Sequence, residues 1–107
     1  MKLDVRFIDS NIIIMLGNKI YSLDILTGYS RKSQRLDNEG ILSIDTLGES
    51  IYVLTSSKTI KIYDKDINYR GEILLDFIEN VNPGTEVIFI DGYMVLNVDP
   101  QAYVIDL

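Results

Sequence analysis

The chain has 107 residues, 47% of them apolar, which is the length of a single domain and enough apolar material to bury a core. It has neither cysteine nor histidine, which excludes a disulfide framework and removes the commonest general base and transition-metal ligand. The net charge of −6 is unevenly distributed, because residues 71–107 contain seven acidic residues and no basic residue. Binding to phosphates needs clustered bases, so we expect no nucleic-acid partner.

The N-terminal sequence MKLDVRFID contains Asp4, Arg6 and Asp9, which interrupt any hydrophobic region of a signal peptide. The apolar run Ile12–Leu16 is far too short to span a bilayer. We therefore expect a soluble, cytoplasmic protein without a membrane partner.

Residues 1–40 contain the first of three predicted repeats, with strands at residues 5–9, 12–16, 19–24 and 29–36. Ser10-Asn11 and Gly17-Asn18 are typical turn formers and separate the first three strands. The second strand is apolar throughout, which predicts that both of its faces are covered.

The same order of elements returns in the second repeat, at about residues 41–83, and in the third, at about residues 84–107. The predicted strands are 41–45, 50–55, 59–64 and 69–75, and then 87–91, 93–97 and 102–106. Asp99-Pro100 is predicted to be the turn before the last strand. On the second strands of the three repeats we expect a buried set: Ile13, Met15, Val53, Leu54, Val95 and Leu96.

The third strands of the repeats end in Asp24, Asp64 and Asp106, so the repeat advances by 40 and then 42 residues. A period in this range, built from short strands, is typical of a β-propeller, in which each repeat is one four-stranded blade. We predict one all-β domain over residues 1–107 with three propeller-type blades of antiparallel strands, the third lacking its outer strand. The alternative is a compact β-sandwich made from the three repeats.

Two of the third strands resemble known propeller repeats. Lys19–Gly28, KIYSLDILTG, resembles the closing segment of quinoprotein-type repeats, and Thr59–Asp66, TIKIYDKD, resembles the ending of a WD40 repeat with Tyr63 in place of tryptophan. The resemblance covers all three repeats and implies a propeller fold. The chain has no tryptophan and no Gly-His pair at the start of a repeat, so the hydrogen-bonded tetrad of WD40 blades is not implied, and no quinone-binding set is present.

Six aspartates are predicted at strand ends on one face of the molecule, because the first and third strands of a blade run parallel. Asp9, Asp45 and Asp91 are placed nearest a central channel, where carboxylates could hold a hard cation. We predict no metal site, and these three are the candidates for the alternative of a bound cation. Asp24, Asp64 and Asp106 are candidates for contact with a basic partner. The alternative is that all six form Asx-turns with nearby backbone amides.

Arg31, Lys32 and Arg35 lie on the predicted outermost strand of the first blade. They are candidates for docking an acidic partner, or they protect an exposed strand edge from unwanted pairing. The sequence places no nucleophile beside a base, so we expect no catalytic residue and no cofactor.

We therefore expect a non-enzymatic scaffold for protein–protein interaction. A propeller hides its sheet faces by closing, and three blades leave two faces uncovered. We therefore expect the propeller to be completed by self-association, as a homodimer, or by another subunit of a larger propeller or complex. The alternative function is a ligand-binding, cation-binding or enzymatic propeller that uses the acidic channel mouth.

Overall fold

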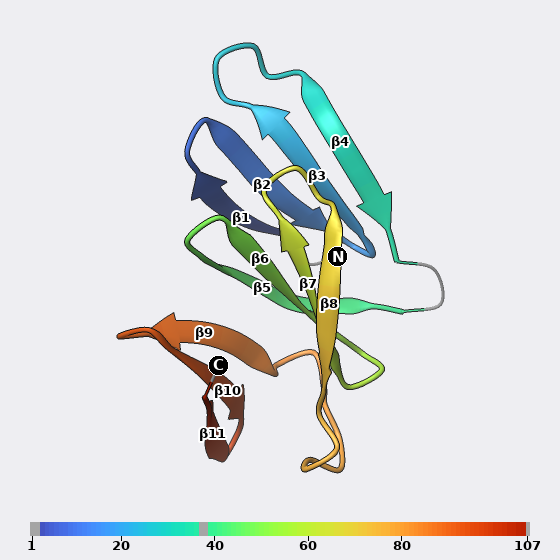
Figure 1. Ribbon diagram of the computed structural model, residues 1–107. Helices are drawn as coiled ribbons and strands as arrows, with labels where there is room; N and C mark the ends of the chain where they lie inside the picture. Colours follow the sequence, from blue (N-terminus) through green and yellow to red (C-terminus); the bar gives the residue numbers. More distant parts are fainter. Residues whose placement is uncertain (1–2, 37–38, 107) are drawn as a thin grey trace.

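The computed structural model describes residues 3–36 and 39–106 and is built from β-strands joined by turns and short connections (Figure 1). The strands are β1 (Leu3–Ile8), β2 (Asn11–Leu16), β3 (Lys19–Asp24), β4 (Ser30–Arg35), β5 (Ile41–Leu47), β6 (Ser50–Thr55), β7 (Thr59–Asp64), β8 (Tyr69–Leu74), β9 (Glu86–Ile90), β10 (Tyr93–Val98) and β11 (Gln101–Ile105). No helix long and apolar enough to cross a membrane occurs in the described part of the chain.

The strands form three separate antiparallel sheets, each continuous in the sequence. Sheet one has the order β1-β2-β3-β4, sheet two β5-β6-β7-β8, and sheet three β9-β10-β11. The all-β class and the three-blade arrangement are therefore confirmed, and within the described residues the third sheet has no outer strand beside β11. The alternative was a compact β-sandwich made from the three repeats, whereas each repeat forms a separate sheet of its own.

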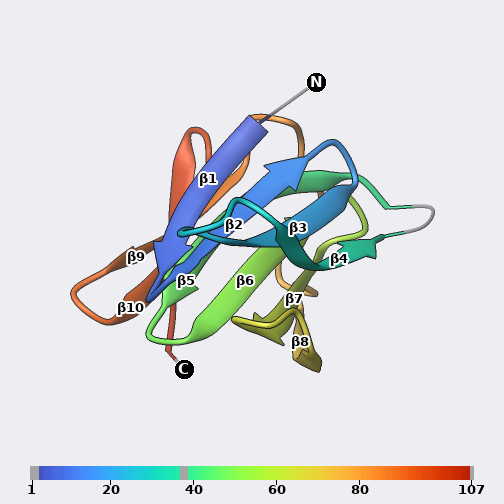
Figure 2. The same ribbon diagram turned by 90° about the horizontal axis from the view of Figure 1, so that it is seen from above.

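The sheets are stacked in chain order like a fan, with sheet two in the middle (Figure 1). Figure 2 looks down on sheet one, which lies over sheet two. The first strands of the sheets are neighbours, because β1 lies beside β5 and β5 lies beside β9. Successive side chains of a strand point to opposite faces, so each sheet offers one face to each side of the stack.

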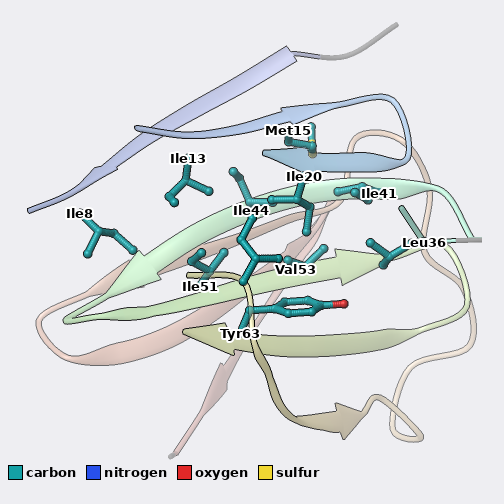
Figure 3. Packing of buried hydrophobic residues seen from close by; sticks show 11 residues of the cluster. Ile8, Ile13, Met15, Ile20, Leu36, Ile41, Ile44, Ile51, Val53 and Tyr63 are labelled. Carbon is teal, nitrogen blue, oxygen red and sulfur yellow. The ribbon is translucent and has the colours of Figure 1, made fainter. Parts of the chain in front are cut away.

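Two apolar cores fill the two junctions between the sheets. In the first junction Ile13, Met15 and Ile20 point from sheet one toward Ile44 and Val53 of sheet two (Figure 3). The second junction packs Leu54 and Ile60 of sheet two against Met94 and Leu96 of sheet three. The ring centroids of Tyr52 and Phe89 meet across this junction at 4.7 Å with an edge-on geometry. Burial of these side chains holds the three sheets together.

The burial expected on the second strands is confirmed for all members of the set except Val95, which is half-buried. The expectation that β2 is covered on both faces is wrong. Ile13 and Met15 are buried against sheet two, but Ile12 and Ile14 on the other face are only half-buried. The reason is the same in both cases, because these side chains face away from the stack and no further sheet of the described chain covers them.

The first strand of the second repeat is longer than its sequence pattern predicts. β5 ends at Leu47, which pairs with Ser50, and the turn is formed by Gly48 and Glu49. Gly48 has a φ of 60°, a left-handed conformation that glycine adopts without strain. The turn glycine therefore sets the end of this strand, and Asp45 lies inside the strand.

Candidate functional site

Asp45 connects all three sheets near their first strands. Its Oδ1 accepts a hydrogen bond from Nε of Arg6 at 3.1 Å, and its Oδ2 accepts one from the backbone N–H of Phe89 at 2.9 Å. Arg6 also contacts Asp4 on its own strand. Burial lowers the pKa of Arg6, but the hydrogen bond to Asp45 and the charge of Asp4 outweigh this effect and raise it. The carboxylate of Asp45 thus acts as an internal connector of the sheets.

The placement of Asp45 corrects the predicted set of three channel aspartates. Counted from the turns, Asp45 occupies the position of Arg6 in sheet one, and Asp9 and Asp91 correspond to each other. Asp9 and Asp91 are the first residues after β1 and β9, and both have a φ of 51°. Among the described residues, no group of three or more acidic side chains is placed to hold a metal ion.

Lys65 neutralises part of the predicted acidic face. Its Nζ lies 3.2 Å from Oδ2 of Asp9 and 3.4 Å from Oε1 of Glu49, so the Lys65 ammonium group pairs with one carboxylate from sheet one and one from sheet two. Its backbone carbonyl accepts hydrogen bonds from Nδ2 of Asn11 and Oγ of Ser22, each at 3.1 Å. Lys65 therefore ties the turn end of sheet one to the turn end of sheet two.

Asp64 forms an Asx-turn after β7. Its Oδ1 accepts hydrogen bonds from the backbone N–H groups of Asp66 and Asn68, both at 2.9 Å, and its Oδ2 lies 3.0 Å from Nη2 of Arg70. Burial raises the pKa of Asp64, but the two N–H groups, the Asn68 amide and Arg70 together lower it to about 2. The turn-forming alternative holds for Asp64, and Asp24 likewise accepts a bond from the N–H of Leu26 at 2.8 Å.

The remaining predicted contact residues lie on two different sheets. Arg35 and Lys32 are exposed on β4, the outer strand of sheet one, and Nζ of Lys32 donates to Oδ1 of Asn68 at 2.7 Å. The side chain of Arg31 lies outside the described part of the structure. Asp106 follows β11 in sheet three and is exposed, and it forms no ion pair among the described residues. The structure does not unite these residues in one site.

Sheet one presents an apolar surface on the side away from sheet two. Phe7 on β1 is 63% exposed, and Leu3 and Val5 beside it are exposed as well. This sheet-one face is formed by the residues that pair across the sheet on that side: Leu3, Val5, Phe7, Ile12, Ile14, Leu16, Lys19, Tyr21, Leu23, Ser30, Ser33 and Arg35. An apolar surface of this kind is a sign of an interaction site in a folded protein.

Sheet three presents a second such surface on its far side. Val104 on β11 is 66% exposed and Tyr93 on β10 is 55% exposed, and Ile90 beside Tyr93 is also exposed. This sheet-three face is formed by Glu86, Ile88, Ile90, Tyr93, Val95, Asn97, Ala102 and Val104. An array of three blades predicts an uncovered face at each end, and the structure identifies the residues of both faces.

Residues on these two faces are equivalent, by their place in the repeat, to residues that are buried between the sheets. Counted from the turn pairs, Ile12 and Ile14 of β2 correspond to Ile51 and Val53 of β6, whose exposed fraction is 0%. The corresponding residues of β10 are Met94 and Leu96, also at 0%. In the same way Val95 corresponds to Ile13. The repeat register was the signal in the sequence that could have identified both faces.

A depression of about 360 Å³ lies between the β8–β9 connection and the β10–β11 turn. It is lined by Phe77, Ile78, Glu79, Asn80, Val98, Asp99, Pro100, Gln101 and Tyr103. None of the three predicted channel aspartates lines it. The depression is therefore separate from the turn ends where the alternative function would place its chemistry.

No protein-family model and no curated protein matches the chain. Among solved structures, the chain is similar to the computationally designed Ika4 protein, with a TM-score of 0.65 and 15% identity. The match covers 94% of this chain and 62% of that chain, so the present chain spans less than two thirds of the design. The designed Ika8 protein matches 94% of this chain and 44% of its own length at 15% identity, with a TM-score of 0.40. The similarity to Ika4 concerns the fold alone.

Proposed function

We propose that the chain is a non-enzymatic protein–protein interaction module, a partial β-propeller whose two open faces are covered by further sheets of the same kind. The single observation that supports this is the repeat register of the faces. Ile12 and Ile14 occupy positions that are fully buried wherever a preceding sheet is present, as Ile51 and Val53 are. The equivalent side chains are thus fully buried in the second and third repeats but only half-buried in the first repeat.

One further observation supports the assignment to the propeller class. The sheets follow one another in chain order with their first strands adjacent, as blades do around an axis. The covering sheets come from another copy of the chain or from a different polypeptide, and in either case the function is assembly.

Light scattering on the isolated chain tests this proposal. Because two apolar faces are exposed, the wild-type chain should be heavier than its 12.2 kDa monomer or should aggregate. Phe7→Glu and Val104→Glu each place a charge on one face without touching either internal core, and each should reduce association while the chain stays folded. Gln34→Glu, on the exposed outer strand β4, is the matched control and should leave association unchanged. A wild-type chain that is a stable monomer at low micromolar concentration contradicts the proposal.

A further inference from the structure

Building on the proposed function, we infer that a second copy of this chain covers the open faces in a head-to-tail arrangement. The sheet-three face of one copy packs on the sheet-one face of the other, and the internal junctions serve as the template. Two copies that meet at both ends in this way form a closed ring with two equivalent junctions.

The two faces are the complementary halves of a junction that occurs twice inside the chain. In the first internal junction Ile13 of sheet one packs against the core that contains Ile51 and Val53 of sheet two. On the sheet-three face Val95 holds the position of Ile13, and on the sheet-one face Ile12 and Ile14 hold those of Ile51 and Val53. Apolar side chains therefore stand at these positions on both faces, whereas Asn97 and the smaller Ala102 take the places of Met15 and Ile20.

Near the turns, the two faces also carry apolar side chains at positions that would meet each other. Inside the chain, Ser22 of sheet one donates a hydrogen bond to the backbone carbonyl of Lys65 in sheet two. The register places Val104 at the position of Ser22 and Ile25 at the position of Lys65. Both residues are exposed, as is Leu26, which is 88% exposed. An apolar contact between Val104 and Ile25 thus replaces the polar contact of the internal junction.

Charge favours the pairing of unlike faces. Lys19 and Arg35 are the charged residues among those assigned to the sheet-one face, and Glu86 is the charged residue among those assigned to the sheet-three face. Residues 71–107, which include sheet three, contain seven acidic residues and no basic residue. Two sheet-one faces placed together would oppose like charges, whereas the head-to-tail pairing brings opposite charges together.

Cysteine cross-linking tests the arrangement directly, because the chain contains no cysteine of its own. Ile25→Cys and Val104→Cys are prepared as separate variants with tags of different mass, mixed, and treated with a short bis-maleimide reagent. The expected major product contains one chain of each variant, in several-fold excess over products of two identical variants, and its yield should fall in 1 M salt. The intramolecular pair Asp9→Cys with Lys65→Cys is the positive control, since these side chains meet across the first internal junction and both are accessible to the reagent. Glu72→Cys, on the outer strand of sheet two, is the negative control.

Equal yields of mixed and identical products overturn the head-to-tail arrangement. Cross-linking of Glu72→Cys as efficient as that of Ile25→Cys with Val104→Cys overturns it as well. If the wild-type chain aggregates and the cross-linking is unselective in this way, the faces are instead covered by a different protein. The proposed function is then retained, and the pairing with a second copy is rejected. If the wild-type chain is monomeric and Ile25→Cys and Val104→Cys give no mixed product, both proposals fail. A mixed product as the dominant species supports both.

Discussion

The second strands of the three sheets have similar apolar sequences but different surroundings. β6 in the middle sheet is buried along nearly its whole length, whereas β2 and β10 alternate between buried and partly exposed positions. The difference lies in the neighbours, because β6 has a sheet on each side and the other two have one. An unbroken apolar strand therefore does not by itself show that both of its faces are covered, because β2 is as apolar as β6 and has a neighbouring sheet on one side only.

The largest effect is expected for Ile13→Asp. Ile13 is fully buried in the first junction, and an unpaired carboxylate there should cost several kcal/mol, which is most of the stability of a small domain. Circular dichroism should show an unfolded chain. Ile14→Asp on the opposite side of the same strand is the matched variant and should remain folded. Cooperative melting of Ile13→Asp near the wild-type temperature would contradict the assignment of this junction.

A smaller difference is expected between Ile51→Ala and Ile12→Ala, which change equivalent positions. Loss of the Ile51 side chain from the first core should cost about 2–5 kcal/mol, since the junction retains a cavity. Loss of the half-buried Ile12 side chain should cost about 1 kcal/mol or less. Urea denaturation in a Val104→Glu background, in which association should be reduced, measures both, because Val104 is on sheet three and contacts neither position. Equal costs would mean that the chain itself covers the sheet-one face.

Strand order and sheet membership were predictable from local signals. Turn residues such as Gly17, with a φ of 64°, and Gly92, with a φ of 82°, mark the hairpins because few other residues adopt this conformation readily. The 40-residue period then groups the hairpins into sheets. Within the described residues the third sheet contains β9, β10 and β11 and no outer strand, as predicted.

The functional assignment of the aspartates was less predictable because similar sequence endings have different structural positions. The endings FID and SID place Asp9 in a turn and Asp45 inside a strand, since the next turn glycine lies three residues beyond Asp45. Contacts between sheets also depend on side chains distant in sequence. Arg6 and Asp45 are 39 residues apart, and no local pattern links them.

Asp45→Asn is expected to destabilise the chain by about 1–3 kcal/mol. The substitution puts an amide where Oδ1 and Oδ2 accept bonds from Arg6 and from the N–H of Phe89, so one of these donors loses its acceptor. Asp91→Asn is the matched control, because Asp91 is exposed in a turn whose conformation asparagine tolerates. Thermal melts should separate the two variants. Equal melting temperatures would exclude Asp45 as a connector of the sheets.

A pH titration should isolate the contribution of Asp64. Its pKa falls from the ordinary value of 3.8 to about 2 in the folded chain, so the ionised form is favoured by folding. The resulting stabilisation is complete above about pH 4 and is lost as the pH falls toward 2. Asp64→Asn keeps the turn-forming geometry and removes the titration, so its melting temperature should depend less on pH between 4 and 2. Parallel pH profiles of the variant and the wild type would refute this account.

The smallest effect is expected for Ca²⁺, which should leave the melting temperature unchanged. A divalent cation stabilises a fold only if the folded state assembles its oxygen ligands. Here Asp9 is paired with Lys65, and both oxygens of Asp45 accept hydrogen bonds from other residues, so a cation would have to displace these partners. Mg²⁺ at equal ionic strength is the control for charge screening. A saturable rise with Ca²⁺ that Asp45→Asn abolishes would instead place a cation among the first strands and favour the alternative function at the channel mouth.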